Sequence, residues 1–236
     1  MPSAPIILVP GFWLGAWAWD DVVARLEAAG QTATALTLPG LAPEEDRSTV
    51  HFQDHVDAIA DAVQSAGVPV VLAVHSARGY AGYAVADRMP DRIAHLVYVD
   101  SAPGKGAMDP EFADADKPLM SEEELEAEEN LDGLSKAQLA EFRRRAVPEP
   151  GATLREGVEL TNDARRDVPS TIICTGFPSE KVKQAVEDGY SWLAGIPELR
   201  NVTWVDLPTS HWPMWSKPDE LAQLIGDIAA GASTVD

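Results

Sequence analysis

The sequence lacks most of the features that commit a chain to disulfides or structural metals. It contains one cysteine, Cys174, so no internal disulfide can form and no cysteine pair is available for a zinc site. With 236 residues the chain can bury roughly 70% of its unfolded surface, so it needs neither a disulfide nor a structural metal to fold. A single cysteine in a chain of this length is typical of a reducing compartment, and we expect a cytoplasmic protein.

Basic side chains are also scarce. Lysine and arginine together number 18 against 38 aspartates and glutamates, which gives a formal net charge of −20. Because lysine and arginine drive binding to phosphates, this balance disfavours nucleic acid and anionic membrane surfaces as partners. The partner that we expect is a small-molecule substrate, and the sequence leaves the oligomeric state open.

Long unbroken hydrophobic runs are missing too. Residues 1–19 carry no charged side chain, but Pro10 and Gly11 interrupt them. A secretory signal would need a basic start, and a membrane helix would need about 20 apolar residues without such a break. We therefore interpret residues 6–9 as a buried strand followed by a loop.

Short apolar runs alternate with helical patterns over most of the chain, which is typical of an α/β protein with a mostly parallel sheet. The runs are nearly continuous, as in strands that helices cover on both faces. We expect strands at 6–9, 32–38, 69–74, 94–99, 170–175 and 202–207. Apolar residues three and four apart predict amphipathic helices at 20–29, 52–66 and 219–230.

One region interrupts this alternation. Residues 101–168 show no convincing strand, and residues 109–132 hold eleven acidic side chains against one lysine. Two helices are expected here, at 121–130 with Ser121 as N-cap and at 135–146. We interpret residues 1–236 as a single domain with a core formed by 1–100 and 169–236. The insertion at about 101–168 is expected to be a helical cap over the carboxyl edge of the sheet.

Two polar segments stand at predicted strand ends, where open α/β sheets bind ligands. The third strand leads into His75 and Ser76, and a helix follows. A serine on such a tight turn, called a nucleophile elbow, presents its hydroxyl above the sheet beside N–H groups at a helix N-terminus. The last strand leads into Ser210 and His211 before the final helix. The order serine, carboxylate, histidine is the one expected of α/β-hydrolases.

The chain resembles the α/β-hydrolase superfamily over essentially its whole length. Its N-terminal third resembles the branch that contains plant methyl esterases and hydroxynitrile lyases. The segments that carry the resemblance are 9–12 (VPGF), 15–19 (GAWAW), 26–30 (LEAAG), 36–40 (LTLPG), 75–76 (HS), 210–211 (SH) and 215–219 (WSKPD).

The resemblance implies a serine hydrolase that needs neither a metal nor a cofactor. Ser76 would be the nucleophile and His211 the general base, and the backbone N–H groups of Phe12 and Ala77 would hold the oxyanion. We expect cleavage of a small, fairly apolar ester or lactone through an acyl-enzyme. The alternatives are a lyase or cofactor-free oxygenase on the same fold, or a catalytically degenerate protein that only binds a ligand.

Two carboxylates compete to orient His211. Most family members place the acid after the next-to-last strand, where this chain has Glu180 nearby but a serine at the usual position of the aspartate. Others place it after the strand that follows the elbow helix, where this chain has Asp100. Because an aspartate ending a buried strand is costly unless paired, we favour Asp100 and keep Glu180 as the alternative. A serine–histidine dyad or another acid remains a third possibility.

Two further departures from the family pattern bear on the chemistry. The glycine positions of the Gly-x-Ser-x-Gly elbow hold Val74 and Arg78, with the next glycine at Gly79, so the turn must open slightly or pack differently. For Arg78 we favour an ion pair with an acid of the cap over binding of a substrate carboxylate. Lyase members carry a lysine beside the site, whereas Trp212 follows His211 and no ammonium is evident, which favours hydrolysis.

Several other side chains could serve either in the packing of the core or in a substrate pocket. Trp13 and Trp212 flank the expected oxyanion loop and the histidine, so both are candidates for the pocket wall, with core packing as the alternative. His75 is expected to pack beneath the elbow. Four residues separate His51 from His55, but no third metal ligand is apparent, so we expect surface or cap contacts. His95 is expected to pack between a helix and a strand.

Overall fold

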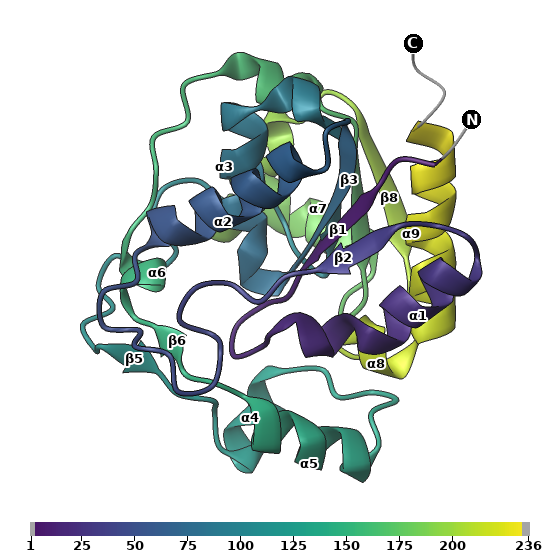
Figure 1. Cartoon of the computed structure of the whole chain (residues 1–236). Coiled ribbons are helices and arrows are strands. Elements are labelled where there is room, and N and C mark those ends of the chain that lie inside the picture. Colours follow the sequence, from purple (N-terminus) through teal and green to yellow (C-terminus); the bar gives the residue numbers. More distant parts are fainter. Residues whose placement is uncertain (1–2, 233–236) are drawn as a thin grey trace.

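A six-stranded parallel sheet lies between two layers of helices in the computed structural model, which describes residues 3–232 (Figure 1). The strand order is β2-β1-β3-β4-β7-β8. This arrangement confirms the expected α/β class. The strands are β1 (Ile6–Val9), β2 (Ala33–Ala35), β3 (Val70–His75), β4 (Ile93–Val99), β7 (Ser170–Cys174) and β8 (Val202–Asp206).

Successive strand residues point to opposite faces of the sheet, and each face meets its own helices. Ile7 and Val9 pack on the side covered by α2 and α3. Ile6 and Leu8 pack on the side covered by α1 and α9. The helices around the sheet are α1 (Asp20–Ala28), α2 (Phe52–Ser65), α3 (Gly79–Arg88), α7 (Ser179–Glu187), α8 (Pro213–Ser216) and α9 (Pro218–Ala232). Within residues 3–232, no helix is both long and apolar enough to span a membrane.

The sequence located these strands well, with one exception at the edge of the sheet. Strand β2 covers three residues, whereas the apolar pattern predicted seven, 32–38. It pairs with β1 alone, so no second neighbour extends its ladder, and the chain turns away before Pro39, which has no N–H to donate. The short edge strand leads directly into the loop that approaches the cap.

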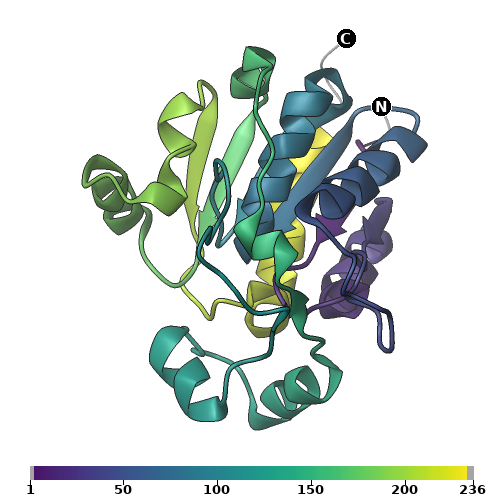
Figure 2. The same ribbon diagram turned by 90° about the vertical axis from the view of Figure 1, so that its left-hand side faces the viewer.

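The chain leaves the sheet after β4 and crosses its carboxyl edge before it returns at β7. Helices α4 (Glu122–Glu128) and α5 (Lys136–Arg145) lie beyond the strand ends there (Figures 1 and 2). Each begins at a serine N-cap, Ser121 and Ser135, whose hydroxyl accepts a hydrogen bond from the backbone N–H three residues later. The predicted N-cap at Ser121 is therefore confirmed.

The cap also contains strands, contrary to the expectation for this segment. β5 (Asp116–Lys117) and β6 (Glu149–Pro150) pair antiparallel, and the short helix α6 (Ala152–Arg155) follows. A two-residue strand carries no periodicity that a sequence pattern could reveal. These short strands set the position of Lys117 and Glu149, which matter for the site described next.

Candidate active site

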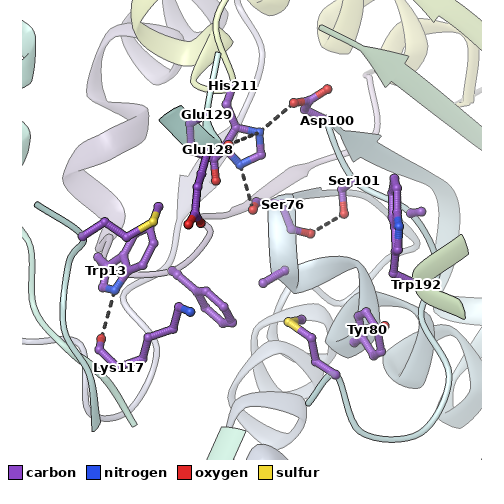
Figure 3. Close-up of a pocket in the computed structure, with 15 residues that line it drawn as sticks. Trp13, Ser76, Tyr80, Asp100, Ser101, Lys117, Glu128, Glu129, Trp192 and His211 are labelled. Carbon is purple, nitrogen blue, oxygen red and sulfur yellow. Dashed lines mark hydrogen bonds and ion pairs between the residues drawn. The ribbon is translucent and has the colours of Figure 1, made fainter. Parts of the chain in front are cut away.

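Three of the predicted site residues meet at the carboxyl edge of the sheet (Figure 3). Ser76 Oγ lies 2.9 Å from His211 Nε2, and His211 Nδ1 lies 2.6 Å from Asp100 Oδ2. The other carboxylate oxygen of Asp100 accepts hydrogen bonds from the backbone N–H groups of Thr175, at 2.9 Å, and Gly176, at 3.3 Å. In such an arrangement the imidazole can take the serine proton while the carboxylate fixes its tautomer and orientation.

Burial and hydrogen bonds together determine the protonation of His211 and Asp100. Burial disfavours the imidazolium of His211, but the hydrogen bond and the charge of Asp100 outweigh it and raise the pKa of His211. Burial also acts to raise the pKa of Asp100, yet the hydrogen bonds from His211 and Thr175 lower it overall. Asp100 is therefore an ionised partner that keeps His211 basic.

The turn that carries Ser76 is strained in the way a nucleophile elbow requires. Ser76 has a φ of 55°, in the left-handed region that non-glycine residues rarely adopt. The hydroxyl of Ser101, just after β4, donates a hydrogen bond to the carbonyl of Ser76. The buried strand before the serine and the helix after it hold this conformation, which projects Oγ over the end of the sheet.

The unusual residues of the elbow are accommodated by different packing. Val74 is buried against Gly82 of α3, where a Cβ would lie 2.8 Å from Val74 Cγ1. At Gly79 a Cβ would lie 2.0 Å from the carbonyl oxygen of Ala102. The close approaches between strand, helix and neighbouring loop thus occur at Gly79 and Gly82, which leaves the usual glycine positions free to carry side chains.

Arg78 forms a buried ion pair with the cap, as the sequence favoured. Its Nη2 lies 2.7 Å from Glu149 Oε2, and its Nε donates to the carbonyl of Pro10 at 3.2 Å. His55 Nδ1 lies 3.2 Å from Arg78 Nη1. Burial, together with the charge of Arg78, lowers the pKa of His55 to about 4, so the imidazole stays neutral. Of the two contacts expected for His55, the surface contact is wrong because the side chain is buried, and the structure instead places it beside Glu149 of the cap, at 4.0 Å.

The histidine before the serine supports the site from below. His75 is fully buried, its Nε2 lies 2.7 Å from the carbonyl oxygen of His211, and its Nδ1 accepts a hydrogen bond from the N–H of Gly11 at 3.3 Å. Burial and the neighbouring His211 lower the pKa of His75 to about 3. A neutral His75 that donates from Nε2 ties the histidine loop to the elbow.

The other two histidines make contacts away from the site. His51 Nδ1 lies 2.9 Å from Glu156 in the cap. His95 Nε2 lies 2.9 Å from Thr171 Oγ1, on the strand beside its own. In the part of the chain that the structure describes, no group of three histidine, cysteine or acidic side chains is arranged to hold a metal ion.

A cavity of about 390 Å³ opens beside Ser76. Phe12 and Ala77, the expected oxyanion residues, both line it. Trp13 lines it as well, and its indole N–H donates to the carbonyl of Lys117 at 3.0 Å. The remaining apolar or aromatic parts of the wall come from Tyr80, Ala102, Met108, Met120 and Trp192. A serine hydroxyl beside a mixed, largely apolar cavity is the arrangement of a small-molecule site.

A family model described as "Alpha/beta hydrolase family" matches residues 6–224. This chain belongs to the alpha/beta hydrolase family. The α/β-hydrolase is 27% identical over 252 residues to Methylesterase 7 of Arabidopsis thaliana. This match covers 94% of this chain and 95% of the plant protein. It is 39% identical over 101 residues to Esterase PIR7B of Oryza sativa subsp. japonica, but this match spans only 41% of the chain and 38% of the rice protein.

A solved structure supports the same fold. The α/β-hydrolase superposes on an extracellular alpha/beta-hydrolase from a Paenibacillus species with a TM-score of 0.76 and 18% identity, over 96% of this chain and 99% of the other. At this identity the likeness shows the fold alone. Together with the plant relatives, it confirms the resemblance to α/β-hydrolases and plant methyl esterases.

Two predicted site residues of this α/β-hydrolase lie outside the cavity wall. Trp212 is 1% exposed and packs on the rings of Phe142, at 5.1 Å between centroids, and Trp215, at 6.1 Å. It belongs to the aromatic core, and its ring also meets the imidazole of His211 edge-on, at 5.0 Å between centroids. Glu180 lies exposed on α7 and pairs with Lys183 at 2.7 Å. The structure brings Asp100, not Glu180, to His211.

Three charged cap residues line the cavity without having been singled out in the sequence: Lys117, Glu128 and Glu129. Figure 3 shows the ammonium of Lys117 directed into the cavity. The expectation of a site without an ammonium was therefore wrong. Lys117 is the one lysine in the acid-rich segment 109–132, which is a visible signal, but its place depends on the pairing of β5 with β6.

Proposed function

We propose that this α/β-hydrolase cleaves a small, fairly apolar carboxylic ester or lactone through an acyl-enzyme on Ser76. The observation that carries the proposal is the continuous set of contacts from Ser76 Oγ through His211 to Asp100, open to a cavity. The names of the relatives, an esterase and a methylesterase, support the same class of reaction.

In the proposed reaction His211 Nε2 takes the proton of Ser76 while Oγ attacks the carbonyl carbon of the ester. The carbonyl oxygen becomes negative and is held by the backbone N–H groups of Phe12 and Ala77, each worth about 3 to 4 kcal/mol in the transition state. His211 then returns the proton to the departing alcohol oxygen. A water molecule that His211 deprotonates then attacks the acyl carbon. His211 returns this proton to Ser76 Oγ as the bond between Oγ and the acyl carbon breaks, and the acid departs.

A second hollow next to the cavity could hold part of an ester substrate. This hollow of about 240 Å³ adjoins the first and shares Asp100, His211 and Trp192 with it. Its inner wall is apolar, formed by Ile172, Ile173, Cys174, Val182 and Leu193. Ser76 lines the first hollow and not the second, so an ester bound at Ser76 would reach the second hollow past His211 and Trp192.

A lyase reaction at the same site is a second candidate. The observation in its favour is the Lys117 ammonium in the cavity, because a positive charge stabilises an anionic leaving group. In that reaction His211 would act as base and Ser76 would form no covalent bond.

The direct test compares hydrolysis of short p-nitrophenyl esters by the wild type and Ser76→Ala. We expect Ser76→Ala to lose at least about 10³-fold in kcat/KM, since the nucleophile is gone. Ser65→Ala, at the exposed end of α2, is the matched control and should hydrolyse at the wild-type rate. Equal rates for the wild type and Ser76→Ala would contradict the proposal.

A further inference from the structure

A second carboxylate, from the cap, faces the histidine of the site. Glu129 Oε2 lies 3.9 Å from His211 Nδ1, the nitrogen that also contacts Asp100 (Figure 3). The side chains of His211 and Glu129 are 15% and 27% exposed, so water screens the interaction between them only in part. Glu129 makes no hydrogen bond to the imidazole at this distance, and its effect is therefore electrostatic.

The cap is fixed to the histidine loop at this point by two hydrogen bonds. The backbone N–H of His211 donates to the carbonyl of Asn130, the residue after Glu129, at 2.8 Å. The side-chain amide of Asn130 donates to the carbonyl of Thr209 at 2.9 Å. The N–H of Glu129 itself donates to the carbonyl of Leu125, at the end of α4. The backbone thus holds Glu129 beside His211 on both sides.

Among residues 3–232, few other charges act on His211. The titratable groups that face it are Asp100 from the end of β4, Glu129 from the cap, and His75 from β3, which is neutral because burial lowers its pKa to about 3. Around Glu129 itself lie Glu128 and Lys117, and Asp100 approaches the same imidazole nitrogen as Glu129. Burial raises the pKa of Glu129, and the charge of His211 opposes that rise.

We propose that Glu129 is a positioning residue that sets the basicity of His211 by placing a cap-borne negative charge beside the imidazolium formed during the reaction. An opposite charge within about 4 to 6 Å favours the charged form of a titrating group. The cap thereby strengthens His211 as a base, while the neutral form needed to start the reaction becomes rarer at acid pH. The kinetic part of this inference rests on the proposed function, whereas the titration of His211 does not.

The first test measures the titration of His211 directly by NMR of its imidazole, in the Ser76→Ala background so that turnover plays no part. In Glu129→Gln we expect the pKa of His211 to fall by roughly one unit. Glu129→Asp keeps the charge and should recover most of the shift. Glu126→Gln removes the same charge from an exposed position of α4 and should leave the pKa within about 0.2 unit of its starting value, because solvent screens it.

The second test is the pH profile of kcat/KM for a short ester in the active protein. Glu129→Gln should move the acid limb to lower pH by the shift seen in the titration, and lower the plateau kcat by up to about tenfold. Damage to the structure alone would lower the rate without moving the limb.

The outcomes separate this inference from the proposed function. A His211 pKa that is the same in Glu129→Gln and Glu126→Gln would overturn the role of Glu129, whether or not the enzyme hydrolyses esters. A clear shift in a protein that hydrolyses no ester would support Glu129 and reject the hydrolase reaction.

Discussion

The carboxyl edge of the sheet and the cap form one cavity from two different kinds of structure. At the sheet edge, Ser76 and Asp100 have positive φ angles of 55° and 43°, and the buried strands before them hold those turns in place. In the cap, α4 and α5 bury a single side chain each, Leu125 and Phe142, and the segment supplies Lys117 and two glutamates to the cavity wall.

The properties of the site therefore come from two regions of the molecule. The proposed reacting groups lie where buried strands fix the backbone, which suits a geometry that must be kept within fractions of an ångström. The two cap glutamates that line the cavity lie at the end of helix α4, which buries only Leu125. The Arg78–Glu149 ion pair and the contact of Asn130 with the histidine loop are two of the contacts that join the two regions.

The largest expected effect comes from the sheet edge. Asp100→Asn should lower kcat for a short ester by about 10⁴-fold, because an amide cannot stabilise the imidazolium and favours the wrong tautomer of His211. The matched control is Glu180→Gln, the acid that the structure leaves exposed on α7, and it should keep the wild-type rate. A larger loss in Glu180→Gln than in Asp100→Asn would reverse this assignment.

The next effect tests the joint between the two regions. Glu149→Gln leaves the buried guanidinium of Arg78 without its charged partner, and we expect the free energy of unfolding in urea to fall by about 3 kcal/mol. Glu141→Gln removes an exposed ion pair with Arg144 in the same cap and should change the unfolding midpoint little. Similar effects of the two substitutions would mean that the cap is not anchored through Glu149.

The smallest expected effect is on the pH dependence of stability. In the folded protein the pKa values of His55 and His75 are about 4 and about 3, below the value in the unfolded chain. The unfolded chain therefore binds protons that the folded protein does not, and the free energy of unfolding falls as the pH drops through the unfolded pKa. Each of the two histidines should lower the free energy of unfolding by about 1 kcal/mol between pH 7.5 and 5.5. The free energy of unfolding, measured with urea at several pH values in this window, should fall less steeply with decreasing pH in His55→Asn than in the wild type.

His51→Gln is the control for this slope, because His51 is exposed and its pKa is raised, chiefly by its hydrogen bond with Glu156. It should leave the loss of stability below pH 6.5 in place. An unchanged slope in His55→Asn would place the acid sensitivity elsewhere in the molecule.

The parts of the fold that the sequence predicted well are those governed by continuous burial. The strands around 70–75 and 93–99 are apolar at successive positions because helices cover both faces, and the expected strands match them within two residues. The pairing of Ser76 with His211 followed from their order and strand-end positions. The cost of leaving a carboxylate unpaired at the end of a buried strand favours Asp100.

The remaining features depend on contacts between segments far apart in the chain. The packing of Val74 on Gly82 explains an elbow that the motif alone left ambiguous. Arg78 and Glu149 are 71 residues apart, and no local pattern pairs them. Glu129 lies in an acid-rich run that looks solvated, because periodicity reveals an apolar face but not which charged side chain reaches a cavity.

The central claim, that Ser76 is a nucleophile activated by His211, is tested most directly by a fluorophosphonate probe followed by peptide mapping of the modified protein. We predict one equivalent of label on Ser76 in the folded wild type, no label in Ser76→Ala, and slow labelling in His211→Ala. A folded wild-type protein that stays unlabelled, or that carries the label on Ser101 or another residue, would contradict the account.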